Sequence, residues 1–216
     1  MTRRSSLAAI AATSVVTGFA RLVTGVRGNW RGALPDPRPR IYFANHRSHG
    51  DFVLLWTVLP RALRRSTRPV AAADYWGRGG IRQFFGRNVF DAVLVEREAA
   101  RRDNDPTLPL LAALDAGNSL ILFPEGTRNT TEAPLLAFKS GLFRLARQRP
   151  TVELIPVWID NLNRVMPKGE FLPVPLLCTV TFGAPIFVGD GESNFAFRER
   201  SRAALLALAP NGEAGS

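Results

Sequence analysis

Short apolar runs separated by segments with helical periodicity are the feature that most constrains this chain. The runs at 41–44, 119–123 and 154–159 are almost uninterrupted, which is typical of strands covered on both faces. Strands that alternate with helices of about ten residues predict an α/β fold with a largely parallel sheet. Further strands are predicted at 69–73, 91–96 and 176–182, helices at 52–59, 108–114, 139–147 and 195–208, and a short helix or loop at 75–85.

The length and composition favour one globular unit. The chain has 216 residues, of which 46% are apolar and 21% charged, enough for one domain with a sizeable core. We therefore predict a single α/β domain whose mixed, mostly parallel sheet is covered by helices. Residues 1–30 are predicted to form an amphipathic, membrane-associating helix, 31–209 the main domain and 210–216 a flexible tail. Within the strand 154–159, Pro156 is expected to mark a sheet edge or a bulge.

The net charge of +10 comes almost entirely from arginine. A basic surface of this kind suits nucleic acid, an anionic membrane or phosphorylated small molecules, although a compositional bias of the genome would also produce it. Residues 61–68 carry four arginines and no acid, and we expect a basic loop there. The single cysteine, Cys178, excludes an internal disulfide and a cysteine-cluster metal site.

The N-terminal stretch 7–26 is long enough to span a bilayer, but alanine and threonine dilute it and it contains Arg21. On a helix, one face would carry Val15, Phe19, Leu22, Val23 and Val26, and the other Thr13, Thr17, Arg21 and Thr24. This stripe favours a helix that lies in a membrane interface or docks on its own domain. A secretory signal is the alternative, because Arg3 and Arg4 precede the apolar stretch, but we find no persuasive small-x-small cleavage site.

Both histidines of the chain, His46 and His49, lie in the stretch NHRSHGD at 45–51, directly behind the predicted strand 41–44. Ligands of α/β sheets gather at the carboxyl ends of strands, where helix N-termini point at them. Across a turn into the next helix, Asp51 can accept a hydrogen bond from His46. That bond fixes the tautomer of the imidazole and leaves its other nitrogen as a base.

Two structural interpretations of this stretch stay open. Ser48 and Asp51 match a helix-capping box, with Ser48 as N-cap and Asp51 at the third helical position. A histidine five residues before an aspartate also occurs often by chance. We assign no catalytic role to His49, which is expected to cover the helix start or line the rim of the site.

A second polar motif, FPEGTRN, follows the predicted strand 119–123. Gly126 permits a ligand to approach the backbone closely, and Arg128 can hold a phosphate through two parallel hydrogen bonds. Glu125 can accept hydrogen bonds from hydroxyl groups. The alternative is a self-contained turn in which Glu125 pairs with Arg128.

Two further cations follow predicted element ends. Arg97 comes directly after the strand 91–96, and Lys139 opens the helix 139–147. If neighbouring strands end together, Arg97 and Arg128 face the same pocket as His46, with Lys139 near the same edge. Cations beside one base favour a phosphorylated or otherwise anionic substrate, whereas a solvated strand end is the alternative for Arg97.

Taken in their order along the chain, the motifs around His46, Arg97, Arg128 and Lys139 resemble those of the glycerophospholipid acyltransferase family, the 1-acylglycerol-3-phosphate acyltransferases and their relatives. Residues 46–51 match that family's H-x4-D motif, and residues 123–128 match its F-P-E-G-T-R block. Three weaker matches are VLVER at 93–97, FKSG at 138–141 and IPV at 155–157. The resemblance spans about residues 40–185, within the domain predicted at 31–209.

The resemblance implies an O-acyltransferase that moves a fatty acyl group from acyl-CoA or acyl carrier protein to the free hydroxyl of a lysophospholipid. The acceptor it suggests is 1-acylglycerol-3-phosphate, which would give phosphatidate. His46 would be the general base and Asp51 would orient it. The acceptor would be held by Arg97, Glu125, Gly126, Thr127, Arg128 and Lys139. The resemblance implies no metal and no bound cofactor, and a location at the cytoplasmic face of the membrane, peripheral or monotopic.

Other functions stay open at this point. Ser140 occupies a position where a second lysine is frequent in the family, and NTTEAP at 129–134 lacks basic residues. Another lysolipid, such as lyso-ornithine lipid, is therefore an alternative acceptor. A non-catalytic basic protein that binds lipid or nucleic acid is the other class, but the sequence carries no recognised motif of a DNA- or RNA-reading domain.

Overall fold

The structure is a computed structural model that describes residues 7–73, 86, 89–95, 105–160 and 178–210. Its centre is one seven-stranded sheet in the order β1-β7-β6-β2-β5-β3-β4. Five strands run parallel to one another: β2 (Arg40–Ala44), β3 (Thr67–Ala72), β4 (Val93–Val95), β5 (Ser119–Leu122) and β6 (Glu153–Asp160). β1 (Arg27–Trp30) and β7 (Thr179–Phe182) run the opposite way, because β7 pairs with β6 in antiparallel fashion. The predicted mixed, mostly parallel sheet is confirmed.

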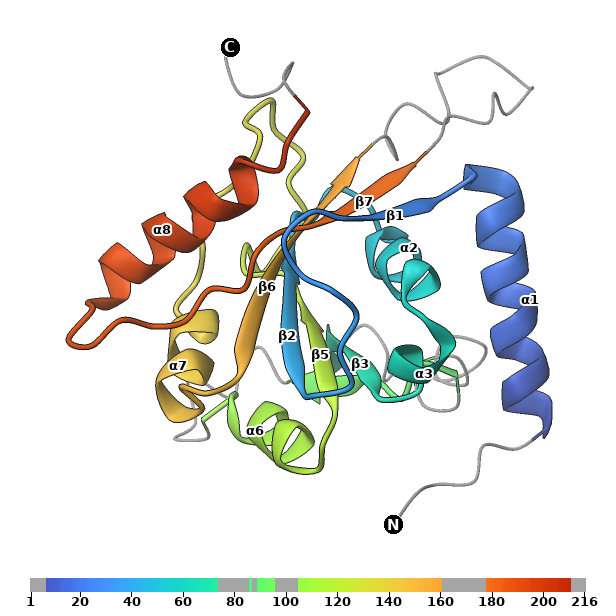
Figure 1. The fold of residues 1–216 in the computed structure, drawn as a ribbon, viewed down its shortest axis with the longest axis horizontal. Coiled ribbons are helices and arrows are strands. Elements are labelled where there is room, and N and C mark those ends of the chain that lie inside the picture. The colour runs from blue at the N-terminus through green and yellow to red at the C-terminus, as the bar shows by residue number, and fades with distance from the viewer. Residues whose placement is uncertain (1–6, 74–85, 87–88, 96–104, 161–177, 211–216) are drawn as a thin grey trace.

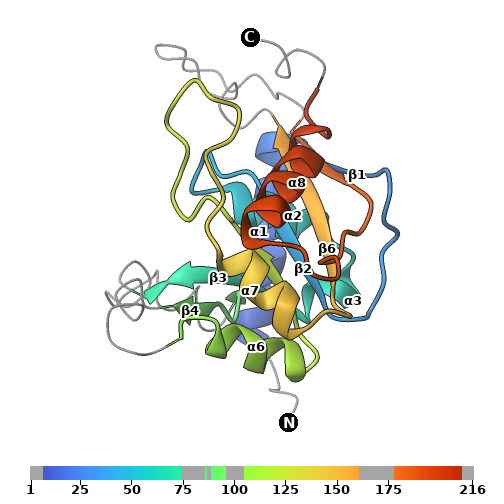
Figure 2. The same ribbon diagram turned by 90° about the vertical axis from the view of Figure 1, so that its left-hand side faces the viewer.

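Helices cover both faces of this sheet (Figures 1 and 2). On one face lie α1 (Leu7–Thr24), α2 (Asp51–Val58) and α3 (Arg61–Arg64), and on the other lie α6 (Leu108–Asp115), α7 (Gly141–Gln148) and α8 (Asn194–Leu206). Strand β2 is buried along its whole length. Its residues alternate between the two cores, since Tyr42 packs with the α2 side and Phe43 with the α7 side. A continuous apolar strand is therefore explained by two covered faces.

One strand was not predicted, and one expected loop is not a loop. β1 is not indicated by its sequence, because RGNW is short and polar, yet it forms the sheet edge beside β7. The basic stretch 61–68 is not a loop: it contains α3 and the start of β3. Leu63 anchors α3 in the core, and Arg64 donates hydrogen bonds to the carbonyls of Thr57 and Leu59 at the end of α2. The predicted segment 75–85 lies outside the described residues.

Pro156 lies in an interior strand, so the expectation of an edge is wrong, but the expected bulge is present. The register slips by one residue beside the proline, since Leu154 bridges Ile186 whereas Val157 pairs with Phe182. The N–H of Leu154, two residues earlier, donates to Ile186, and the carbonyl of Pro156 accepts from Gly183. Both groups face the β7 side, where pairing with β7 begins only at Val157. The missing N–H of the proline therefore faces the bulge beyond the end of β7, a kind of position that tolerates proline.

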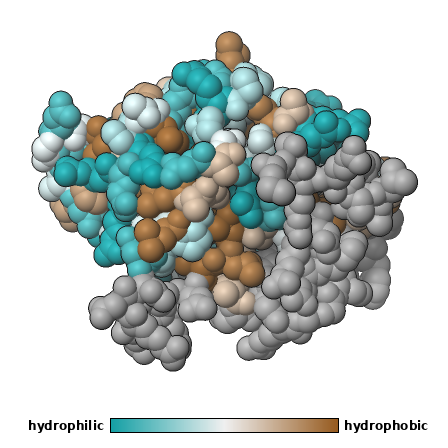
Figure 3. Space-filling view, turned by 90° about the horizontal axis from the view of Figure 1, so that it is seen from below, coloured by the Kyte–Doolittle hydropathy of each residue, from teal (hydrophilic) through white to brown (hydrophobic). Residues whose placement is uncertain are grey.

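Helix α1 docks on the domain with its threonine side. Thr17 and Ala20 are buried, whereas Val15, Phe19 and Leu22 are 69%, 66% and 82% exposed. Apolar side chains also reach the surface elsewhere, as the mixed colouring of Figure 3 shows, but these three follow one another at helical spacing on one element. In the part of the chain that the structure describes, no helix has the length and apolarity needed to cross a bilayer.

Candidate active site

The two strongest sequence motifs meet at the carboxyl ends of β2 and β5. These strands pair side by side, with Phe43 opposite Leu122, so the residues that follow them emerge together. The imidazole of His46 stacks on the ring of Phe123 at a centroid distance of 4.2 Å and an interplanar angle of 21°. The topology thus brings 45–51 and 123–129 into one site at the N-terminus of α2.

His46 and Asp51 form the predicted pair. Nδ1 of His46 lies 2.9 Å from Oδ2 of Asp51, and their side chains are 20% and 3% exposed. Oδ2 also accepts the backbone N–H groups of Arg47 and Ser48, each at 2.8 Å. This one oxygen therefore faces the His46 ring and two backbone N–H groups at the N-terminus of α2. A hydrogen bond from Nδ1–H to Asp51 leaves the lone pair of Nε2 available as a base.

The capping-box interpretation is wrong for Ser48. Helix α2 begins at Asp51, its N-cap is Gly50, and no side chain caps it. The hydroxyl of Ser48 instead accepts the N–H of Gly50. Asp51 does accept the N–H of Ser48, but it does so from the first helical residue and shares the same oxygen with His46. The stretch HRSHG is therefore a turn wrapped around the Asp51 carboxylate.

Glu125 supports the histidine from the other strand. It is 2% exposed, its Oε1 accepts the N–H of His46 at 2.9 Å, and its Oε2 accepts the N–H of Leu136 at 2.8 Å. Burial raises the pKa of this carboxyl group, while the two backbone N–H groups act against that shift. The alternative of a Glu125–Arg128 pair is thereby excluded. The role of Glu125 in binding substrate stays a prediction, since both oxygens already have backbone partners.

The next three residues, Gly126, Thr127 and Arg128, are exposed. Gly126 has φ +70°, and an added Cβ would lie 2.7 Å from Cδ and 3.0 Å from Nζ of Lys139. A side chain at this position would therefore displace the lysine. Arg128 makes no hydrogen bond or ion pair with the described residues. Lys139 is exposed too, so Arg128 and Lys139 are two exposed cations at this turn. Arg97, the third predicted cation, lies outside the described residues.

Two asparagines contribute to the site without having been predicted. Asn45 exchanges two hydrogen bonds with the backbone of Ile159, at 2.9 and 2.8 Å, and so holds the end of β2 against β6. Asn129 is 4% exposed, and its N–H donates to the carbonyl of His46 at 2.6 Å. A signal was present for Asn129, because asparagine is favoured in turns, where its side chain bonds to nearby backbone groups such as the N–H of Thr131.

The described part of the chain holds no group of three or more histidine, cysteine, aspartate or glutamate residues arranged to bind a metal ion. What the site offers is an oriented imidazole and two exposed cations, Arg128 on the neighbouring turn and Lys139, whose side chain lies beside Gly126 of that turn. Such a site is suited to removing the proton from a hydroxyl group of an anionic molecule.

Known acyltransferases are similar to this chain in sequence and in fold. The model of the Acyltransferase family matches residues 29–160. A taffazin from Dictyostelium discoideum is 31% identical over 71% of this chain and 54% of its own length. A 1-acyl-sn-glycerol-3-phosphate acyltransferase from Limnanthes douglasii is 28% identical over 82% of this chain and 60% of its own length. The chain thus spans little more than half the length of these relatives.

A solved structure shows the same fold. The 1-acyl-sn-glycerophosphate (LPA) acyltransferase PlsC from Thermotoga maritima superposes with a TM-score of 0.68 over 96% of this chain and 82% of that one, at 20% identity. The family match covers more than half of the chain, and the sequence relatives and the fold point the same way. This chain therefore belongs to the glycerophospholipid acyltransferase family.

Proposed function

We propose that this protein transfers a fatty acyl group from acyl-CoA or acyl carrier protein to the free hydroxyl of a lysophospholipid, with 1-acylglycerol-3-phosphate as the acceptor and phosphatidate as the product. The observation that carries the proposal is the His46–Asp51 pair at 2.9 Å, next to the exposed Arg128 and Lys139. The relatives named 1-acyl-sn-glycerol-3-phosphate acyltransferase support the choice of acceptor.

In the proposed reaction, Nε2 of His46 takes the proton of the acceptor hydroxyl while the oxygen of that hydroxyl attacks the thioester carbonyl carbon. The tetrahedral intermediate collapses, the C–S bond breaks, and the imidazolium returns the proton to the departing thiolate. Asp51 keeps the ring oriented and stabilises the imidazolium. Arg128 and Lys139 hold the phosphate of the acceptor, with Gly126 allowing it to approach the backbone. No acyl-enzyme forms.

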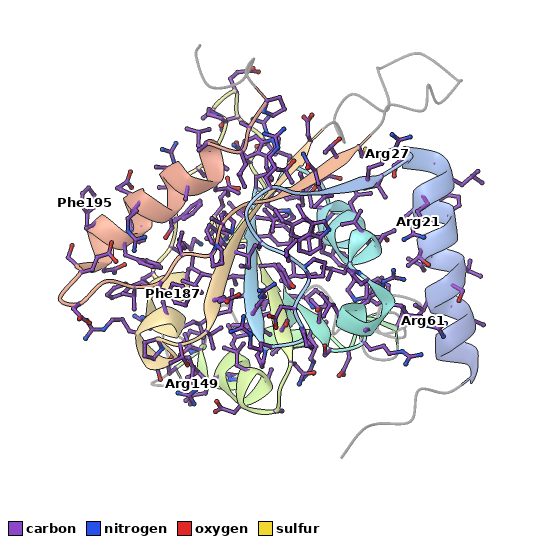
Figure 4. All side chains as sticks on the ribbon, viewed as in Figure 1. Arg21, Arg27, Arg61, Arg149, Phe187 and Phe195 are labelled. Carbon is purple, nitrogen blue, oxygen red and sulfur yellow. The ribbon has the colours of Figure 1, made fainter. Side chains whose placement is uncertain are left out.

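We further propose that the enzyme works at a membrane surface. Its acceptor is a lipid, and α1 presents Val15, Phe19 and Leu22 outward on one side. Figure 4 shows Arg21, Arg27 and Arg61 on the same side of the molecule, around α1 and α3. Apolar side chains flanked by arginines suit the interface of an anionic bilayer.

The test is release of free thiol from acyl-CoA or acyl carrier protein, with lysophosphatidate, glycerol phosphate and lyso-ornithine lipid as parallel acceptors. We expect turnover with lysophosphatidate and its loss by about 100-fold or more in His46→Ala, the usual contribution of a general base. His49→Ala, which removes the other histidine, is the matched control and should keep most of the activity. Wild-type turnover by His46→Ala would refute the base assignment, and turnover with only another acceptor would correct the substrate.

A further inference from the structure

The turn FPEGTRN is divided into two sets of residues with different surroundings. Gly126, Thr127 and Arg128 are exposed, and they are the residues that can meet a substrate. Glu125 and Asn129, at either end of this exposed stretch, are 2% and 4% exposed. The buried residues must therefore act through the protein.

Both backbone groups of His46 are held by this turn. Its N–H donates to Oε1 of Glu125 at 2.9 Å, and its carbonyl accepts the N–H of Asn129 at 2.6 Å. Asp51 fixes the imidazole ring, but its side-chain hydrogen bonds go to that ring and to the N–H groups of Arg47 and Ser48, not to the backbone of His46. The position of the catalytic base thus depends on where Asn129 places its own N–H.

The side chain of Asn129 fixes that position by closing the loop 129–133. Its Nδ2 donates to the carbonyl of Ala133 at 2.7 Å. Its Oδ1 accepts both the N–H of Thr131 at 2.9 Å and the hydroxyl of Thr131 at 2.7 Å. The guanidinium of Arg47 reaches the same Ala133 carbonyl at 3.1 Å, so the loop is joined to the histidine turn at a second point.

We infer that Asn129 is a positioning residue for the catalytic base, an inference that rests on the proposed function. Asn129 lies between His46, whose carbonyl it holds, and Arg128, the cation proposed to bind the acceptor. It therefore sets the distance between the base and the bound hydroxyl without touching the substrate. Neither the family motif nor the sequence pattern assigned it this task.

The test compares Asn129→Ala with Thr130→Ala, its exposed neighbour in the same loop, for which the structure gives no hydrogen bond. In Asn129→Ala, we expect kcat to fall at least about tenfold, toward the roughly 100-fold that a misplacement of 1 Å can cost. KM for donor and acceptor should be unchanged, because no substrate contact is removed. Thr130→Ala should match the wild type in kcat and KM.

A second readout does not need turnover. The chain has only two histidines, so a protein with ¹⁵N-labelled imidazoles gives two ring systems, and His49→Gln assigns them. We expect Asn129→Ala to change the Nδ1–H signal of His46, and Thr130→Ala to leave it in place. An inactive wild type with this pattern of signals would count against the proposed function while supporting the positioning role.

Three results would overturn the inference. The first is a wild-type kcat with unchanged His46 signals in Asn129→Ala. The second is a loss that resides only in a raised KM for the acceptor, which would place the effect on Arg128. If circular dichroism shows that Asn129→Ala does not fold, Thr131→Val, which removes one hydrogen bond to Oδ1, takes its place. The third result is a folded Thr131→Val with wild-type kcat and wild-type His46 signals.

Discussion

At the scale of the residue, we predict that the contribution of Glu125 to stability changes with pH in the direction opposite to that of most carboxylates. Burial raises its pKa above the ordinary value of 4.5, so the folded protein keeps this proton to a higher pH than the unfolded chain does. The stability contributed by this group is therefore present below pH 4.5 and is lost as the pH rises through the raised pKa. Most carboxylates held by arginine behave in the opposite way, as Asp36 beside Arg38 does, with a pKa lowered to about 2.

Glu125→Gln isolates this effect, because glutamine does not titrate. We expect the variant to lose about 1–3 kcal/mol, since its amide must turn one N–H toward a backbone donor. The difference in unfolding free energy between wild type and variant should shrink as the pH rises from below 4.5. Urea unfolding over that range measures it, with the exposed Glu132→Gln as the control. A difference that grows with pH would contradict this assignment.

Single residues also show what a sequence can and cannot supply. The contact between His46 and Asp51 could be predicted because their place behind a strand was combined with the block FPEGTR, since the His–Asp spacing alone often occurs by chance. The partners of Glu125 were not, because they are backbone N–H groups of His46 and Leu136, brought close only by folding. Every residue except proline has a backbone N–H, so the sequence does not show which of these groups a carboxylate will bind. A glutamate that binds backbone N–H groups therefore cannot be told, from sequence alone, from one that binds substrate.

At the scale of the element, α1 predicts a membrane contact that one substitution can test. Phe19 is 66% exposed on α1, and Phe195 is 69% exposed on α8, on the opposite side of the molecule (Figure 4). Burying an apolar side chain of this size contributes about 1.5–3 kcal/mol. Phe19→Ser should therefore weaken binding to lipid vesicles by about tenfold or more, as measured by co-sedimentation. Phe195→Ser is the matched control, and an equal loss in both variants would remove the special role of α1.

Helices and strands with a long or strongly apolar sequence pattern were predicted. Elements whose conformation depends on contacts with neighbouring elements were missed. β2, β5 and β6 were recognised because both of their faces are covered. β1 was not, because its four residues become a strand only through pairing with β7. In α3 the arginines suggested a loop, but Leu63 supplies the buried anchor and Arg64 bonds to the end of α2. Short elements of this kind are specified by tertiary contacts.

At the scale of the whole molecule, the parallel sheet explains why motifs far apart in sequence share one site. The residues behind β2 and β5 meet because these strands are neighbours that end together. The alternation of strands and helices predicted that outcome for His46, Arg128 and Lys139. It does not predict strand order, however, and the antiparallel pairing of β7 with β6 follows from contacts that no local pattern encodes.

The distribution of charge over the molecule makes the last prediction. The first acid of the chain is Asp36, so residues 1–35, which include α1, carry arginine but no aspartate or glutamate. With a net charge of +10, the wild type should bind anionic vesicles more tightly than zwitterionic ones at low salt. Raising the salt from 0.1 M to 1 M shortens the screening length from about 10 Å to about 3 Å, and should remove that preference.

The binding that remains at high salt should come from burial of apolar side chains in the bilayer. Phe19→Ser should reduce this contribution, whereas salt should not. Co-sedimentation of wild type and Phe19→Ser with both kinds of vesicle at both salt concentrations separates the two contributions, because one changes with lipid charge and the other with the substitution. Binding that is indifferent to lipid charge at low salt would contradict the electrostatic part. Binding that high salt abolishes completely would contradict the apolar part, since screening does not weaken the burial of Phe19 and Leu22.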